Sequence, residues 1–170
     1  MIESDRVVAR AQRRRLPLPV ELNPRPTWGY NREELFGKDP WRSMCIEAGG
    51  RTDGFCEACG ASLGDPVDCD PMWSWRLVVS ADDQPVLLRR LSRVRALDRG
   101  CYLATHIGLA GNLGLEGAAR ERLRTVNGIG DPEVEAMITE AFELWRWRST
   151  FECVTDLGPW ERATDAVSEW

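Results

Sequence analysis

Three cysteines in the middle of the chain have the spacing of ligands that bind one metal ion. Cys56 and Cys59 flank two residues, a spacing that lets two thiolates on one tight turn bind the same tetrahedral ion. A complete site closes with a second such pair some tens of residues later, and here that pair is Asp98 and Cys101. The fourth ligand is either the Asp98 carboxylate, which zinc accepts, or Cys69 if the chain folds back. The pattern predicts one structural zinc, and the alternative is that the thiols pack as small apolar side chains.

A second candidate group contains the only histidine of the chain, His106. Tyr102 lies four residues before it, so on a helix the two side chains share one face and can reach one ligand. This spacing predicts a functional pair. The alternative is a half-buried histidine whose nitrogens are satisfied by hydrogen bonds.

The order of several short motifs resembles bacterial HNH-endonuclease-like proteins of the ββα-metal class, over residues 24 to 157. The motifs are Trp28-Gly29-Tyr30, the CxxCG from Cys56 to Gly60, Asp68-Cys69 with Trp73, Leu97 with Cys101, His106 with Gly108, and Val126-Asn127-Gly128. The resemblance implies an α+β fold: a ββα-metal core with a zinc-knuckle CxxC loop, packed against additional C-terminal helices. In that family the hairpin and helix carry a general-base histidine and the ligands of a catalytic divalent metal.

Carried over position by position, the resemblance divides the chain's candidate residues into a zinc set and a catalytic set. Cys56, Cys59 and Cys101 match zinc ligands, and Asp98 stands where the family has a fourth cysteine. The resemblance therefore implies the same metal site that the spacing predicts.

At the catalytic positions, His106 matches a metal ligand of the helix. Asp70 stands at the general-base position, and Tyr102 stands where a second helix histidine is expected. Because an ordinary aspartate, with a pKa of about 4, is a poor base for water at neutral pH, we expect no divalent metal at Asp70 and His106 and no DNA cleavage. If the three residues meet as the resemblance implies, they can form an acid–base set beside Trp73 and Trp75, in an apolar pocket for an organic ligand.

Three functions are compatible with these residues. The first, which we expect, is a catalytically degenerate HNH-like domain that binds a protein partner or nucleic acid without cutting it. The second is a repurposed HNH-like enzyme that acts on a small organic molecule, for example in specialised metabolism, through Asp70, Tyr102 and His106. The third is an active metal-dependent nuclease, against which the lost base and the net charge of -5 both argue. The sequence does not distinguish between the first two functions, because a fold alone does not specify its ligand.

Composition bounds the overall organisation of the chain. Its 170 residues, 43% of them hydrophobic, suffice for one domain with a real core. The absence of a long apolar run and of a signal pattern predicts a cytoplasmic protein without a membrane partner, whose thiols are free or metal-bound. We expect a basic arm at 1–23, the HNH-like domain at 24–157 and a tail at 158–170.

Arginines gather in two places against an acidic background, since the sequence pI is about 5.1. The arm carries Arg10, Arg13, Arg14 and Arg15, and the central stretch carries Arg89, Arg90, Arg93, Arg95 and Arg99. We interpret both groups as solvated faces balanced by the acidic C-terminal part.

Local patterns predict the remaining elements. Asp39 and Pro40 predict the cap and first turn of a helix over 41–48, and β-branched and aromatic residues predict a strand over 73–79. Residues 87–97 fit helical and extended spacing alike, and the resemblance favours the extended form. Helices are predicted from 98 to glycines at 111 and 114, then over 115–126 and 131–148, and an edge strand over 151–157.

Overall fold

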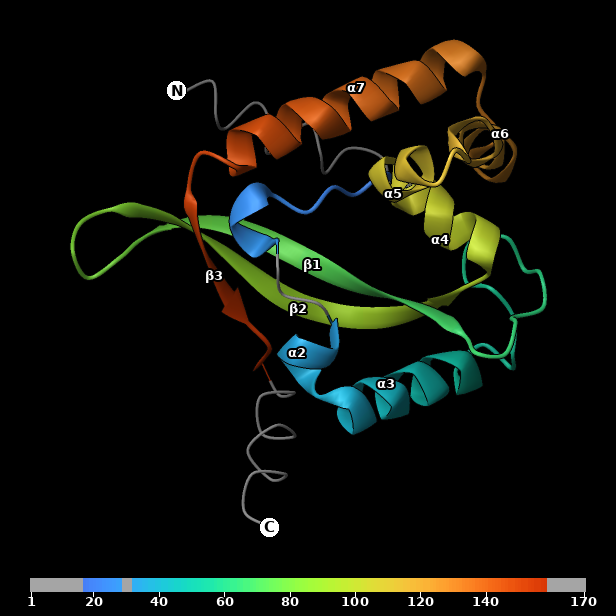
Figure 1. Cartoon of the computed structure of the whole chain (residues 1–170), viewed down its shortest axis with the longest axis horizontal. Coiled ribbons are helices and arrows are strands. Elements are labelled where there is room, and N and C mark those ends of the chain that lie inside the picture. The colour runs from blue at the N-terminus through green and yellow to red at the C-terminus, as the bar shows by residue number, and fades with distance from the viewer. Residues whose placement is uncertain (1–16, 29–31, 159–170) are drawn as a thin grey trace.

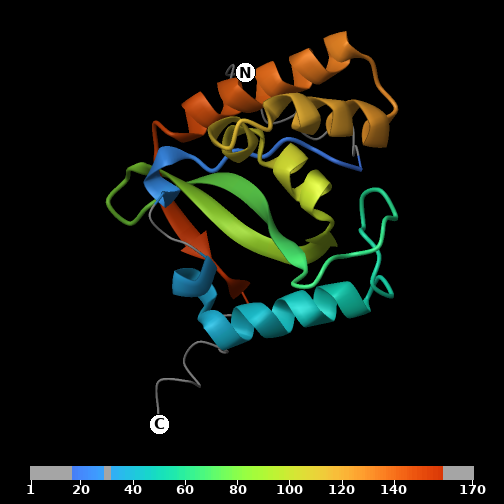
Figure 2. The ribbon, with the colours of Figure 1, turned by 45° about the vertical axis from the view of Figure 1, so that its right-hand side comes forward.

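The computed structural model describes residues 17–28 and 32–158, so most of the basic arm and the tail after residue 158 lie outside it. The chain is α+β, with a three-stranded sheet between two groups of helices. Figures 1 and 2 both show α2 and α3 on one side of the sheet and α4 to α7 on the other. The elements are, in order, η1 (Arg25–Thr27), α2 (Arg32–Phe36), α3 (Lys38–Gly50), β1 (Asp68–Val79), β2 (Pro85–Leu97), α4 (Arg99–Thr105), α5 (Ile107–Asn112), α6 (Glu116–Asn127), α7 (Asp131–Arg148) and β3 (Glu152–Asp156).

A long hairpin forms the centre of the sheet. β1 and β2 pair antiparallel from Asp68 opposite Leu97 to Val79 opposite Pro85, with an irregularity between Met72 and Trp73. The extended form expected for residues 87–97 is confirmed. The strand predicted over 73–79 begins earlier, at Asp68, because its first residues pair with the end of β2.

The third strand adds to the hairpin from the far end of the chain. β3 pairs parallel to β2, which gives the strand order β1-β2-β3. The predicted edge strand is therefore confirmed.

Helix α3 is longer than predicted and begins at a different residue. Its N-cap is Gly37, whose φ of 77° suits glycine, and not Asp39 as expected. Asp39 lies in the first turn, where its carboxylate is favourable beside the helix N-terminus. Met44 and Ala48 are buried against the sheet side of the core.

The helix expected after residue 98 is two helices. α4 ends at Thr105 and α5 begins at Ile107, and His106 between them has φ -100° and ψ 60°. The prediction that Tyr102 and His106 share one continuous helix is therefore wrong. They remain neighbours, because the His106 amide donates to the Tyr102 carbonyl at 3.1 Å.

The two following helices match their predicted limits closely. α6 ends before Gly128, whose φ of 60° gives the left-handed cap that stops the helix. α7 buries Val134 and Ile138 on its inner side. None of the helices in the described ranges is both long and apolar enough to cross a bilayer.

Buried side chains form two clusters that correspond to the two helical layers. One gathers α4 to α7 around Leu97 and Cys101, and the other gathers α2 and α3 around Leu91 and Val94. The sheet contributes Cys69, Leu91, Val94 and Ala96 to the second cluster and Leu97 to the first.

The described part of the expected arm belongs to the folded body. Leu18 has no exposed surface, its amide donates to Oδ1 of Asn127 at 3.0 Å, and Nδ2 of Asn127 donates to its carbonyl at 2.8 Å. Further along, the Glu21 amide donates to the Thr105 carbonyl at 2.9 Å. The segment around Leu18 and Glu21 is therefore joined to the body by hydrogen bonds, and the first sixteen residues of the expected arm lie outside the described residues.

Candidate functional site

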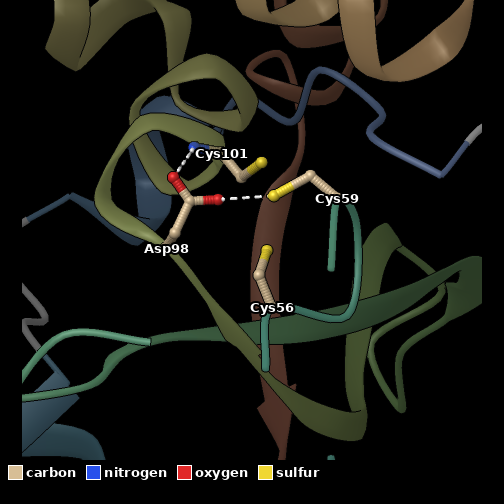
Figure 3. A group of neighbouring side chains, drawn as sticks. All are labelled: Cys56, Cys59, Asp98 and Cys101. Atoms are coloured by element: carbon tan, nitrogen blue, oxygen red, sulfur yellow. Dashed lines mark hydrogen bonds between the residues drawn. The ribbon is translucent and has the colours of Figure 1, made fainter. Parts of the chain in front are cut away.

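Four side chains meet where the hairpin, the cysteine turn and α4 join. One ligand atom each from Cys56, Cys59, Asp98 and Cys101 lies within 4.8 Å of the others. Figure 3 shows the three sulfur atoms and the carboxylate turned toward a common space. Cys69, the alternative fourth ligand, instead lies in the core cluster around Leu91.

The turn that carries the first two cysteines is held by backbone hydrogen bonds. The Cys56 amide donates to the Ala61 carbonyl at 2.7 Å, and the Gly60 amide donates to the Cys56 carbonyl at 2.9 Å. Gly60 has φ 73°, a conformation that favours glycine. The Glu57 amide donates to the Ala96 carbonyl at 3.0 Å, which fixes the turn to β2.

Asp98 links this turn to the start of α4. Its Oδ1 accepts from the Gly100 and Cys101 amides at 2.9 and 3.4 Å, as an N-cap does. Oδ1 also accepts from Nη2 of Arg122 at 2.8 Å, and Oδ2 accepts from Sγ of Cys59 at 3.0 Å. Burial alone would raise the pKa of Asp98, but hydrogen bonds from the cysteine thiols, Cys101 foremost, hold it well below its usual range.

The thiols of the cluster differ in acidity. A hydrogen bond from Cys101 lowers the pKa of Cys56 to about 6, and the same hydrogen bond raises the pKa of Cys101 far above its usual value. Cys56 is therefore the most acidic thiol of the cluster, and a metal that binds all three sulfur atoms must displace the protons of the others. Three thiolates and one carboxylate are a donor set that a tetrahedral metal ion accepts.

A second polar group lies on the α4 side of the sheet, around Asp70. The Asp70 side chain is 1% exposed and Arg95, directly opposite on β2, is 4% exposed. Nε and Nη2 of Arg95 donate to Oδ2 of Asp70 at 2.9 and 2.7 Å, and Nη2 also lies 3.3 Å from Oγ1 of Thr105. Burial raises the pKa of Asp70, but the hydrogen bond with His106 and the charges of His106 and Arg95 outweigh it, so that the pKa falls below its usual value.

The imidazole of His106 completes this group. Its Nε2 lies 3.0 Å from Oδ1 of Asp70, and its ring centroid lies 4.7 Å from that of Tyr102. Nδ1 makes no hydrogen bond to any residue that the structure describes. The side chain is 17% exposed, so the ring is held from one side and still accessible. The structure thus brings Asp70, Tyr102 and His106 together.

A cavity of about 670 Å³ opens beside His106. Its walls are mainly aromatic and apolar, from Tyr102, Trp28, Phe142 and Trp145. Trp28 and Trp145 stack with ring centroids 6.1 Å apart. Such a volume is ordinary for a site that binds a small organic molecule.

Glu21 also lines this cavity, and sequence reasoning missed it. Burial first, and the nearby Asp70 carboxylate second, raise the pKa of Glu21 to about 7. Its carboxylate has no hydrogen-bond or ion-pair partner among the described residues. Nothing in the sequence around residue 21 indicates this environment, because the neighbours that create it lie far along the chain.

The two tryptophans expected beside His106 lie elsewhere. Trp73 and Trp75 line a second cavity of about 340 Å³, which neither Tyr102 nor His106 borders. The expectation that they wall the same pocket is therefore wrong.

The central arginine cluster is not a free basic surface. Each member has a partner within the protein: Arg89 with Thr155 at 2.6 Å, Arg90 with Asp156 at 2.6 Å, Arg93 with Glu57 at 2.6 Å, Arg95 with Asp70 at 2.7 Å and Arg99 with Asp68 at 3.2 Å. Arg90, Arg93 and Arg99 are exposed, as a solvated face requires. Arg89 and Arg95 are buried, which corrects the expectation for those two.

No protein-family model, curated protein or solved structure matches this chain. The residues and their geometry are therefore the basis for assigning a function.

Proposed function

We propose that the cavity beside His106 binds a small organic molecule and performs general acid–base chemistry on it, with Glu21 and His106 as the proton-transferring groups. The observation that carries this proposal is the pairing, in one cavity, of a carboxylate and a histidine: among residues 17–28 and 32–158, the carboxylate has no hydrogen-bond partner and the histidine is hydrogen-bonded on one ring nitrogen. General acid–base catalysis needs groups that can gain and lose a proton near the working pH.

Glu21 meets that requirement. With a pKa of about 7 it is present in both forms at neutral pH, unlike an ordinary glutamate. Carboxylic acids in partly apolar sites act as general acids for this reason.

His106 is oriented by a carboxylate that is itself fixed. Oδ1 of Asp70 faces Nε2 of His106 while Oδ2 is held by Arg95. In the neutral imidazole, a proton shared with Asp70 stays on Nε2, so Nδ1 carries the lone pair and can accept a proton. Asp70 and Arg95 are then positioning residues that set which nitrogen is the base.

The metal cluster belongs to this proposal as a structural element. We infer that it holds zinc, because thiolates with one carboxylate suit that ion. Zinc would tie the cysteine turn to the N-terminus of α4, the helix that carries Tyr102. A cysteine turn, a long hairpin and a helix follow one another along the chain, and this order supports an HNH-like domain.

Binding of a protein partner or nucleic acid, which the sequence suggested first, receives less support. The central arginines are paired with the protein's own side chains, and phosphate binding would have to break those pairs. Nuclease activity receives even less support, because both carboxylate oxygens of Asp70 are already hydrogen-bonded, one to Arg95 and the other to His106.

The single histidine allows a direct test by NMR. The imidazole signals of His106 need no assignment, so a library of small organic acids, amines and phenols can be screened for compounds that shift them at pH 7. We expect at least one class to shift the signals. In Glu21→Gln the same compounds should bind with altered affinity, whereas in Glu143→Gln, an exposed site on α7, they should bind as before.

A short DNA duplex is the matching competitor in this experiment. Displacement of the small molecule by DNA, or shifts caused by DNA alone, would contradict the proposal and restore nucleic-acid binding.

A further inference from the structure

The second cavity lies between the sheet, α7 and the extended segment at residues 19–22. Trp73 and Trp75 of β1 and Trp147 of α7 provide aromatic walls, and Arg148 is the cation that lines it. Glu21 borders this cavity as well as the one beside His106. The segment that carries Glu21 therefore separates two cavities, only one of which the proposed acid–base chemistry uses.

Arg148 differs from the partnered arginines of β2. Its guanidinium carbon lies 4.4 Å from the ring centroid of Trp75, so the charged plane rests on the indole. Nε is closed off from solvent and has no hydrogen-bond partner. None of its N–H groups donates to a residue that the structure describes, so the terminal Nη groups are those available to the cavity.

Burial lowers the pKa of Arg148 to about 10, although the Glu21 carboxylate nearby raises it. The side chain is still a cation at neutral pH. A half-buried cation without a hydrogen-bonded partner is costly, and an anion that accepts from its N–H groups removes much of that cost.

We propose that this second cavity binds a small flat organic carboxylate, whose charged group contacts the Nη atoms of Arg148 and whose apolar body lies against the apolar side chains that line the cavity. A guanidinium and a carboxylate are both planar, and their hydrogen bonds are charge-assisted. The cavity volume of about 340 Å³ leaves room for a single aromatic ring with its acid group.

A carboxylate fits this site better than a phosphate. Among the described residues that line the cavity, Arg148 is the only cation, and Glu21 lines the cavity too. A phosphate would bring up to two negative charges against one guanidinium and one carboxyl group, whereas a carboxylate brings one.

The test is calorimetric titration of the whole protein with benzoate, benzamide and inorganic phosphate. Benzamide has the shape of benzoate without its charge, so the comparison needs no mutation. We expect benzoate to bind at least about tenfold more tightly than benzamide or phosphate. Equal affinities for benzoate and benzamide would overturn the proposal, and so would tighter binding of phosphate.

Variants locate the contact. Arg148→Gln should weaken benzoate binding at least about tenfold, and Arg146→Gln, an exposed site on the same helix, should leave it unchanged. Glu21→Gln should tighten binding because it removes the facing negative charge. If Arg148→Gln does not fold, Arg148→Lys, which keeps the charge but loses the planar donor group, should weaken binding. Unchanged affinity in the folded Arg148 variant would overturn the proposal.

Discussion

Replacing Glu21 by glutamine should stabilise the protein, and should do so only above the pH at which an exposed glutamate ionises. The pKa of Glu21 is raised from 4.5 to about 7, which corresponds to about 3 kcal/mol of difference between its two protonation states. The folded chain keeps this proton to a higher pH than the unfolded chain does. The free energy of unfolding therefore falls between about pH 4.5 and pH 7 and stays lower above that range. Glutamine has no charge to desolvate, so the free energy of unfolding of the variant does not fall over this pH range.

The expected stability difference between Glu21→Gln and the parent is about 1 kcal/mol at pH 5 and about 3 kcal/mol at pH 8.5. Urea unfolding followed by tryptophan fluorescence, at several pH values and constant metal content, measures it. Glu143→Gln, which changes an exposed carboxylate on α7, is the control and should show no such trend. A difference that stays constant from pH 5 to pH 8.5 would refute the buried environment inferred for Glu21.

The other predictions concern Asp70, the metal and DNA. Asp70→Asn should lower the free energy of unfolding by about 3–5 kcal/mol, measured by urea unfolding, because it leaves the Arg95 charge buried without a carboxylate; a loss below about 1 kcal/mol would show that the pair is solvated. Elemental analysis of protein purified without added metal should find one zinc per chain in the parent and in Cys69→Ser, and a near-zero amount in Cys56→Ser. A parent protein that is folded but contains no zinc would contradict the proposed zinc site. Supercoiled plasmid should stay intact at neutral pH with magnesium or manganese, and cleavage that disappears in Asp70→Ala would contradict the loss of nuclease chemistry.

The features that could be predicted from the sequence are local. The spacing pointed to Cys101 as a cluster partner of the first two cysteines and left Asp98 and Cys69 as alternatives for the fourth ligand, of which the structure brings Asp98 to the cluster. The limits of α7 followed from Pro132 at its start and an apolar stripe of helical period.

The features that could not be predicted depend on packing across the chain. The break at His106 lies within a stretch of helical spacing, and its side chain is held by Asp70, 36 residues away in sequence. The environment of Glu21 is created by residues of β1, β2 and α7 and by His106, between α4 and α5. A glutamate in a proline-rich stretch resembles any exposed glutamate until those elements surround it.

The hydrogen bonds that hold the N-terminal segment have a consequence for synthesis of the chain. Leu18 exchanges hydrogen bonds with Asn127 across 109 positions, and the Arg25 amide donates to Ser149 across 124. Contacts between residues so far apart in sequence slow folding, because forming them costs the entropy of closing a long loop of chain. During translation, residues 17–25 leave the ribosome early and must wait for α6 and α7 before they can dock. Glu21 is thus made among the first residues of the domain and placed among the last.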